Sequence, residues 1–332
     1  MNRIKQVNET YLLTIAAAVG ASVVIAFASA ILGVYEVVTD ELTALLISQA
    51  LLFLPTGVYL WRNKFDLKET IRLKPIKIST VFMLIGFMYA IMPAATLINA
   101  ISLQFTTNVI DDTVTRIAVD HPFAVGMLAV AFIPAVLEES VYRGVFYNEY
   151  RKVNIKKAVV LSGLLFGLAH MNLNQFIYAF LLGMVFSVVV EMTDSILSSM
   201  VLHFVMNGTS MASVYAQEMA KTEMVLEPVE TTDMIAMYIQ SIWFPALAGV
   251  ILACFILRAL AGNEGREQVW KELFGRKKSA DANLIEEVSE KPSAVTETEG
   301  CVEYPEQKLG TMALWIGIVF SIGIMLLIEL TK

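Results

Sequence analysis

Cysteine, histidine and charged residues are all scarce in this sequence of 332 residues. The two cysteines, Cys254 and Cys301, lie far apart, so they predict neither a disulfide framework nor a cysteine-based metal site. Charged residues make up 17% of the chain, against roughly a quarter in soluble domains, and no basic tract suggests nucleic acid as a partner. Apolar residues are abundant instead, at 57% with a mean hydropathy of +0.65. This composition predicts a polytopic membrane protein.

Nine apolar segments are candidates for membrane spans, because a spanning helix needs about 20 mostly apolar residues. They predict an all-α fold, a polytopic transmembrane helical bundle of about eight or nine spans. Residues 28–30 resemble a signal-peptide cleavage site, but the first apolar run is longer than a signal-peptide core of about 7–15 residues, which favours a retained span. The segments are 11–34, 42–61, 80–103, 122–147, 156–172, 174–191, 195–215, 235–260 and 309–330.

Lysine and arginine concentrate in alternate loops, and the loops between them are acidic. The basic segments are 62–77, 151–157 and 258–278. Since cytoplasmic loops carry the excess of basic residues, this pattern predicts a multi-pass protein of the cell membrane with its N-terminus in the cytoplasm. With nine spans, the C-terminus would lie outside.

The same pattern divides the chain into five regions. A short interfacial helix is expected around Trp270, and disorder beyond Lys278, where the composition is polar. The regions are N-terminal helices with a cytoplasmic interfacial loop (1–121), core helices (122–215), an outside loop with the eighth span (216–261), a polar, partly disordered cytoplasmic segment (262–308) and a C-terminal span (309–332).

Two adjacent carboxylates and an arginine interrupt the fourth apolar segment. Ionised groups at membrane depth are costly unless they are paired or face water, so they usually mark function. Glu139 and Arg143 lie four residues apart and can neutralise each other on one helix face. Glu138 points about 100° away, without an obvious partner on its own helix, which suits a general base. Pro134 frees a backbone carbonyl one turn earlier. The alternative is that these charges only hold helices together.

Two of the three histidines also lie in apolar segments. His170 follows Gly163 and Gly167, a spacing that lets helices approach closely. His203 and Asn207 continue a polar stripe in the seventh segment, and a donor pair one turn apart can hold a carbonyl oxygen. Each feature alone is also compatible with simple helix packing.

The depths of these residues provide a test of convergence. Glu138 precedes Arg151 by 13 residues and His170 follows Lys157 by 13 residues, so both should lie roughly 20 Å from the basic layer. Asn207 lies at a similar depth beyond Asp194. Three separate helices thus deliver polar groups to one level, which predicts a shared buried polar cavity.

The order of these motifs resembles the CAAX protease and bacteriocin-processing family of intramembrane endopeptidases, which includes CAAX prenyl protease 2. The resemblance covers about residues 122–210. The motifs that carry it are Glu-Glu-x-x-x-Arg (Glu138, Glu139, Arg143), Phe-x-x-x-His (Phe166, His170) and His-x-x-x-Asn (His203, Asn207).

The resemblance implies hydrolysis of a peptide bond in a peptide or membrane-associated protein. Glu138 would act as general base and His170 would help to hold the attacking water. His203 and Asn207 would stabilise the oxyanion. The supporting residues would be Glu139, Arg143 and Phe166.

Cofactors and other functions stay open at this point. No cofactor is required by such a mechanism, but a divalent metal such as zinc could be held by Glu138, His170 and His203. The expected partners are the peptide or protein substrate and the lipid bilayer. Two other functions fit the composition: a non-catalytic bacteriocin-immunity or scaffold protein, and a proton-coupled transporter that uses the buried acids and histidines as a relay.

Overall fold

The computed structural model describes residues 2–32, 40–106, 110–221, 231–275 and 308–331, which form helices and no strand. The all-α prediction is therefore confirmed for these residues. The α-helices are α1 (Arg3–Leu32), α2 (Glu41–Arg62), α3 (Leu67–Thr70), α4 (Ile78–Ser102), α5 (Ile110–Asp120), α6 (Phe123–Gly126), α7 (Ile133–Glu139), α8 (Asn148–Tyr150), α9 (Ile155–Ala169), α10 (Leu173–Thr193), α11 (Ile196–Lys221), α12 (Thr231–Asn263), α13 (Glu267–Phe274) and α14 (Met312–Leu330), and the π-helices are η1 (Met127–Phe132) and η2 (Ser140–Tyr147).

Within the described ranges, 6 helical stretches are long and apolar enough to cross a membrane, so the predicted count of eight or nine spans is not confirmed. The helix α9 has 15 residues, fewer than the about 20 that a span needs. The helix α11 is long enough but carries a stripe of polar side chains. The side chains of residues 22 and 24–32 in α1 lie outside the described part of the chain. The stretches are Glu41–Arg62, Ile78–Ser102, Phe123–Tyr150, Leu173–Thr193, Met237–Asn263 and Met312–Leu330.

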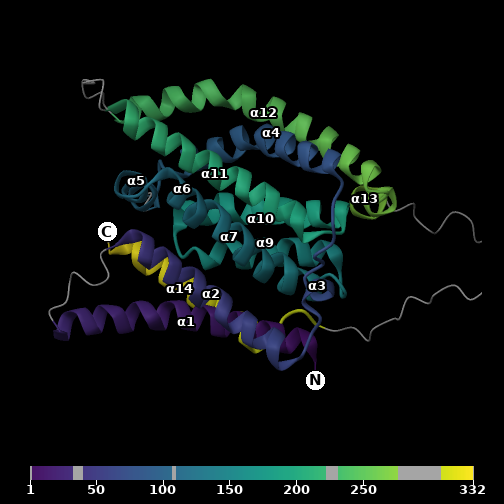
Figure 1. Ribbon diagram of the computed structural model, residues 1–332, viewed down its shortest axis with the longest axis horizontal. Helices are drawn as coiled ribbons and strands as arrows, with labels where there is room; N and C mark the ends of the chain where they lie inside the picture. Colours follow the sequence, from purple (N-terminus) through teal and green to yellow (C-terminus); the bar gives the residue numbers. More distant parts are fainter. Residues whose placement is uncertain (1, 33–39, 107–109, 222–230, 276–307, 332) are drawn as a thin grey trace, which may run out of the picture.

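The helices form three groups, which Figure 1 shows from top to bottom. The pair α4 and α12 covers one side, and α1, α2 and α14 cover the opposite side. Between them lie α7, α9, α10 and α11. The first and last helices pack together, and the Asn8 side chain donates a 2.8 Å hydrogen bond to the Leu309 carbonyl. The two ends of the chain thus support the same flank of the central helices.

The helices α9 and α10 approach each other through glycines. A Cβ atom on Gly163 would lie 2.7 Å from the Phe180 carbonyl oxygen, and one on Gly167 would lie 3.0 Å from that of Phe176. A larger residue at either position would force the helices apart. The close approach predicted from this glycine pair is therefore found, and it brings the end of α9 next to α10.

The stretch Phe123–Tyr150 runs through the centre of the bundle as α6, η1, α7, η2 and α8. Two π-helical segments flank the single α-helical segment α7. A π-helix widens the turn and often accompanies functional sites. Pro134 lies in the first turn of α7. Because proline has no backbone N–H, it cannot donate the i→i−4 hydrogen bond of an α-helix.

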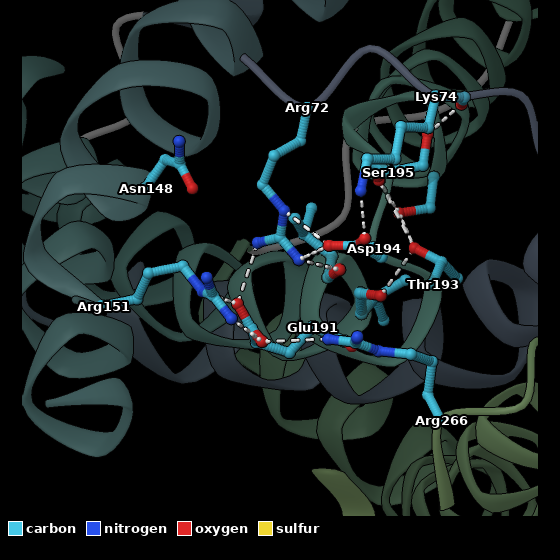
Figure 2. Close-up of polar contacts among 12 residues, drawn as sticks. Arg72, Lys74, Asn148, Arg151, Glu191, Thr193, Asp194, Ser195 and Arg266 are labelled. Carbon is cyan, nitrogen blue, oxygen red and sulfur yellow. Dashed lines mark hydrogen bonds and ion pairs between the residues drawn. The ribbon is translucent and has the colours of Figure 1, made fainter. Parts of the chain in front are cut away.

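A cluster of ion pairs joins three loop segments to the end of α10 (Figure 2). The fully buried carboxylate of Glu191 lies 2.8 Å from Arg72 Nη1, 2.9 Å from Arg151 Nη2 and 3.7 Å from Arg266 Nη2. Asp194, which ends α10 in a left-handed conformation with φ 54°, pairs with Arg72 and Lys74. Each of the three predicted basic segments supplies one arginine, so all three lie on one side of the molecule.

The segment after α12 agrees in part with its prediction. The helix expected around Trp270 is found as α13, whose Phe274 is exposed, and its interfacial position stays a prediction. The predicted disorder beyond Lys278 falls on residues 276–307, which lie outside the described residues.

Candidate active site

Glu139 is the centre of a buried polar group in the bundle. Its Oε1 atom accepts hydrogen bonds from Arg143 Nη1 at 3.0 Å and from His203 Nδ1 at 2.8 Å. Both Glu139 and Arg143 have fully buried side chains. The predicted i,i+4 pair is therefore present, and it also fixes the ring of His203 from α11.

Aromatic rings enclose the Arg143 guanidinium. Its Cζ atom lies 4.2 Å from the centroid of the Phe166 ring and 5.4 Å from that of Phe186. Such cation–π contacts are most favourable where water is excluded. The Phe166 ring also contacts the catalytic candidate His170, whose ring meets it edge-on with 4.9 Å between centroids.

Glu138 is buried one position before Glu139 and points in a different direction. Its Oε1 accepts a 2.8 Å hydrogen bond from Gln49 Nε2 in α2. Its Oε2 lies 3.9 Å from His203 Nε2. This separation is too long for a direct hydrogen bond, so it is a contact at which an intervening water has to be considered.

His170 caps the C-terminal end of α9 and is half-buried. Its Nδ1 lies 2.8 Å from the Phe166 carbonyl oxygen. A carbonyl oxygen can only accept, so Nδ1 must carry the proton of this bond and a neutral ring keeps its lone pair at Nε2. His170 also interacts electrostatically with Glu138 and His203.

Asn207 lies one turn beyond His203 on α11. Its Nδ2 donates a 3.0 Å hydrogen bond to the Val130 carbonyl in η1. That carbonyl is the one to which Pro134 cannot donate an i→i−4 bond. The bond uses one of the two amide hydrogens of Asn207 and leaves the other for a ligand.

The structure thus brings Glu138, Glu139, Arg143, Phe166, His170 and His203 into one connected group, with Asn207 adjacent on α11. Gln49 was not among the residues that the sequence singled out. It comes from a helix 89 residues earlier and belongs to no recognisable motif. The only signal in the sequence is an amide side chain within an apolar span.

The side chains do not fit a metal ion as arranged. Nδ1 of His170 and Nδ1 of His203 are both engaged in hydrogen bonds, so only their Nε2 atoms could bind a metal. Over the described residues, no group of three His, Cys, Asp or Glu side chains surrounds a common point in a way that could hold a metal. The set proposed for zinc, Glu138, His170 and His203, is therefore not arranged as a metal centre, and no step of the mechanism below uses one.

Comparison with known proteins supports the prediction from the motifs. No curated protein and no solved structure matches the chain significantly. The family model described as type II CAAX prenyl endopeptidase Rce1-like matches residues 120–209. All predicted site residues fall inside this range, whereas Gln49 lies outside it. Residues 120–209 of the chain therefore match the Rce1-like family of type II CAAX prenyl endopeptidases, the family that the motifs resemble.

Proposed function

We propose that the protein is an intramembrane endopeptidase that hydrolyses a peptide bond in a peptide or membrane-associated protein, with Glu138 as its general base. The family match supports a peptide hydrolase. The observation that carries the mechanism is the 3.9 Å separation between Glu138 Oε2 and His203 Nε2, which suits one water molecule between a base and a donor.

Glu138 and His170 activate the water. Glu138 Oε2 takes a proton from the water, and the oxygen attacks the carbonyl carbon of the scissile peptide bond. His170 Nε2, whose lone pair is free when Nδ1–H donates to Phe166, accepts the second O–H and orients the water. The carbonyl π electrons move to the peptide oxygen.

His203 and Asn207 stabilise the resulting oxyanion. Because Glu139 accepts from His203 Nδ1, the Nε2 atom of His203 can donate only when the ring carries both protons. Asn207 contributes the amide hydrogen that Val130 does not use. A single oxyanion donor is often worth about 3–4 kcal/mol of transition-state stabilisation.

Collapse of the tetrahedral intermediate completes the reaction. The carbonyl re-forms, the C–N bond breaks, and the leaving amine receives the proton that Glu138 took from water. Glu138 is then a carboxylate again and the products are a carboxylic acid and an amine. Glu139, Arg143 and Phe166 touch no reacting atom in this scheme and hold His203 and His170 in place.

Substitution of Glu138 provides the test. In Glu138→Gln the amide oxygen can still accept the hydrogen bond from Gln49, so we expect the fold to persist. The variant cannot take a proton, so kcat should fall by at least about a thousandfold. The assay uses the full chain in liposomes with an internally quenched farnesylated CAAX-type peptide, and mass spectrometry of membrane peptides from cells that carry either form.

The matched control for this experiment is Ser140→Ala. Ser140 lies two positions further along the same helix and donates to the Val136 carbonyl at 2.6 Å, away from the proposed reaction. It should retain cleavage and thermal stability close to wild type. Equal cleavage by wild type and Glu138→Gln would refute the proposed base.

A further inference from the structure

We propose that Gln49 of α2 is a positioning residue for Glu138; this inference rests on the proposed function. Gln49 donates from Nε2 to Glu138 Oε1 at 2.8 Å. Its side chain is buried, with 7% exposure. It lies outside the matched range 120–209, so the proposed active site would extend to an N-terminal helix.

The direction of the hydrogen bond follows from the chemistry of its partners. An ionised carboxylate only accepts hydrogen bonds, so the NH2 group of Gln49 must face Glu138. The bond occupies Oε1 and fixes the rotation of the carboxylate. Oε2 is thereby left facing His203 Nε2 across the 3.9 Å gap, where the attacking water would lie. Without Gln49, the carboxylate of Glu138 could rotate out of this orientation.

The other end of the Gln49 amide is unused. Gln49 Oε1 is buried and has no hydrogen-bond partner within the described part of the chain. A buried acceptor without a partner costs free energy. A glutamine that served only to join two helices would therefore destabilise the fold through its unpaired Oε1. The free oxygen can accept an O–H of water. Gln49 can therefore hold Glu138 and a water molecule beside it at once.

The surrounding helices keep Gln49 in place. The helix α2 packs against α7, η1 and η2. It begins at a firm N-cap, where the Asp40 side chain accepts from the Thr43 N–H. Thr56, also buried on α2, lies seven positions further along. Its hydroxyl has no hydrogen-bond partner among the described residues, so it supplies a matched control.

The test combines a spectroscopic measurement with kinetics. The infrared difference spectrum of wild type minus Glu138→Gln isolates the carboxylate bands of Glu138. In Gln49→Leu these bands should shift, because the carboxylate loses a donor. With the farnesylated quenched peptide as probe, kcat should fall about 10-fold to 100-fold while KM changes less than about twofold. Thr56→Val should leave both measurements at the wild-type values.

A second variant covers the case in which Gln49→Leu does not fold. Gln49→Glu keeps the length of the side chain but donates only when protonated. The ratio of its kcat to that of wild type should therefore rise as the pH falls, which a purely structural role of Gln49 would not produce. A ratio independent of pH would overturn the proposal.

The outcomes separate this inference from the proposed function. Unchanged carboxylate bands in Gln49→Leu, or shifted bands with unchanged kcat, would overturn the role of Gln49 and leave Glu138 as base. Full activity of Glu138→Gln would overturn both.

Discussion

Adjacent glutamates receive different roles in this bundle because neighbouring helix positions face different partners. Glu139 accepts from both Arg143 and His203 through Oε1, so its charge is balanced by groups within the protein. Glu138 has one neutral donor, Gln49, and a 3.9 Å gap toward His203. The first arrangement stabilises a fixed charge, and the second leaves an oxygen available to water.

The buried pair predicts a large effect on stability when it is broken. Glu139→Gln leaves Arg143 buried without a counter-charge, so the free energy of unfolding should fall by about 3–5 kcal/mol. The exposed pair Lys5 and Glu9 has the same i,i+4 spacing, with 3.8 Å between charges. Glu9→Gln should cost about 0.3–0.5 kcal/mol. Thermal unfolding in detergent measures the loss of stability in both variants. Equal losses in Glu139→Gln and Glu9→Gln would contradict the role of Glu139 as the counter-charge of Arg143.

At the residue scale, the sequence predicted contacts within a helix but not contacts between distant helices. The i,i+4 spacing was sufficient to predict the pairing of Glu139 with Arg143. Nothing in a motif connects Gln49 to Glu138, because packing of α2 on α7 alone brings them together. The roles assigned to Glu138, His170, His203 and Asn207 stay predictions.

At the scale of elements, a proline and a π-helix together create the partner of Asn207. Pro134 cannot donate to the Val130 carbonyl, and Asn207 of α11 donates to it at 3.0 Å. The sequence predicted that Pro134 frees a carbonyl. It did not predict η1 or η2, since π-helices arise from tertiary packing and have no composition of their own. The sequence also predicted a full membrane span at the position of α9, because apolar residues in the adjoining loops lengthen the apolar segment beyond the helix itself.

Restoring the missing N–H tests this connection. In Pro134→Ala the new N–H can bond to Val130 and compete with Asn207. We expect kcat to fall about tenfold with little change in KM, since one oxyanion donor is less well placed, while thermal stability is kept. Pro93→Ala, at a helix-internal proline of α4, should leave kcat unchanged. The account of Asn207 would be wrong if both variants matched wild type.

At the scale of the molecule, Glu191 gathers arginines from three separate segments (Figure 2). The alternation of charged loops predicted that these segments share one side, and their convergence agrees with that. It could not predict that one buried glutamate would join them, because Glu191 reads in the sequence as part of an apolar span. The orientation relative to the cytoplasm stays a prediction.

Asp194 should make this network sensitive to acid. Burial acts to raise the pKa of Asp194, but hydrogen bonds from Lys74 and Arg72 outweigh it and lower the pKa to about 2. Because this value is below the about 3.9 of an unfolded chain, the stabilisation is fully present above about pH 4 and is lost as the pH falls toward 2.

The matching variant is Asp194→Asn, since asparagine also tolerates the left-handed backbone at this position. At pH 7 it should lower the free energy of unfolding by about 1–2 kcal/mol, allowing for solvent screening of a partly exposed group. The difference from wild type should shrink as the pH approaches 2. Thermal unfolding of both proteins and of Asp120→Asn, at an exposed site, measures this. A difference that stays constant with pH would argue against the ion pairs as its cause.

The central claim is that Glu138 activates one water for attack on a peptide bond, and isotope transfer tests it most directly. The full chain in liposomes is given the farnesylated quenched peptide in water enriched in ¹⁸O, under single-turnover conditions, and the new carboxyl terminus is analysed by mass spectrometry. We expect one ¹⁸O atom per cleaved peptide with wild type and no cleavage with Glu138→Gln. Cleavage by Glu138→Gln at the wild-type rate, or products without ¹⁸O, would contradict the account.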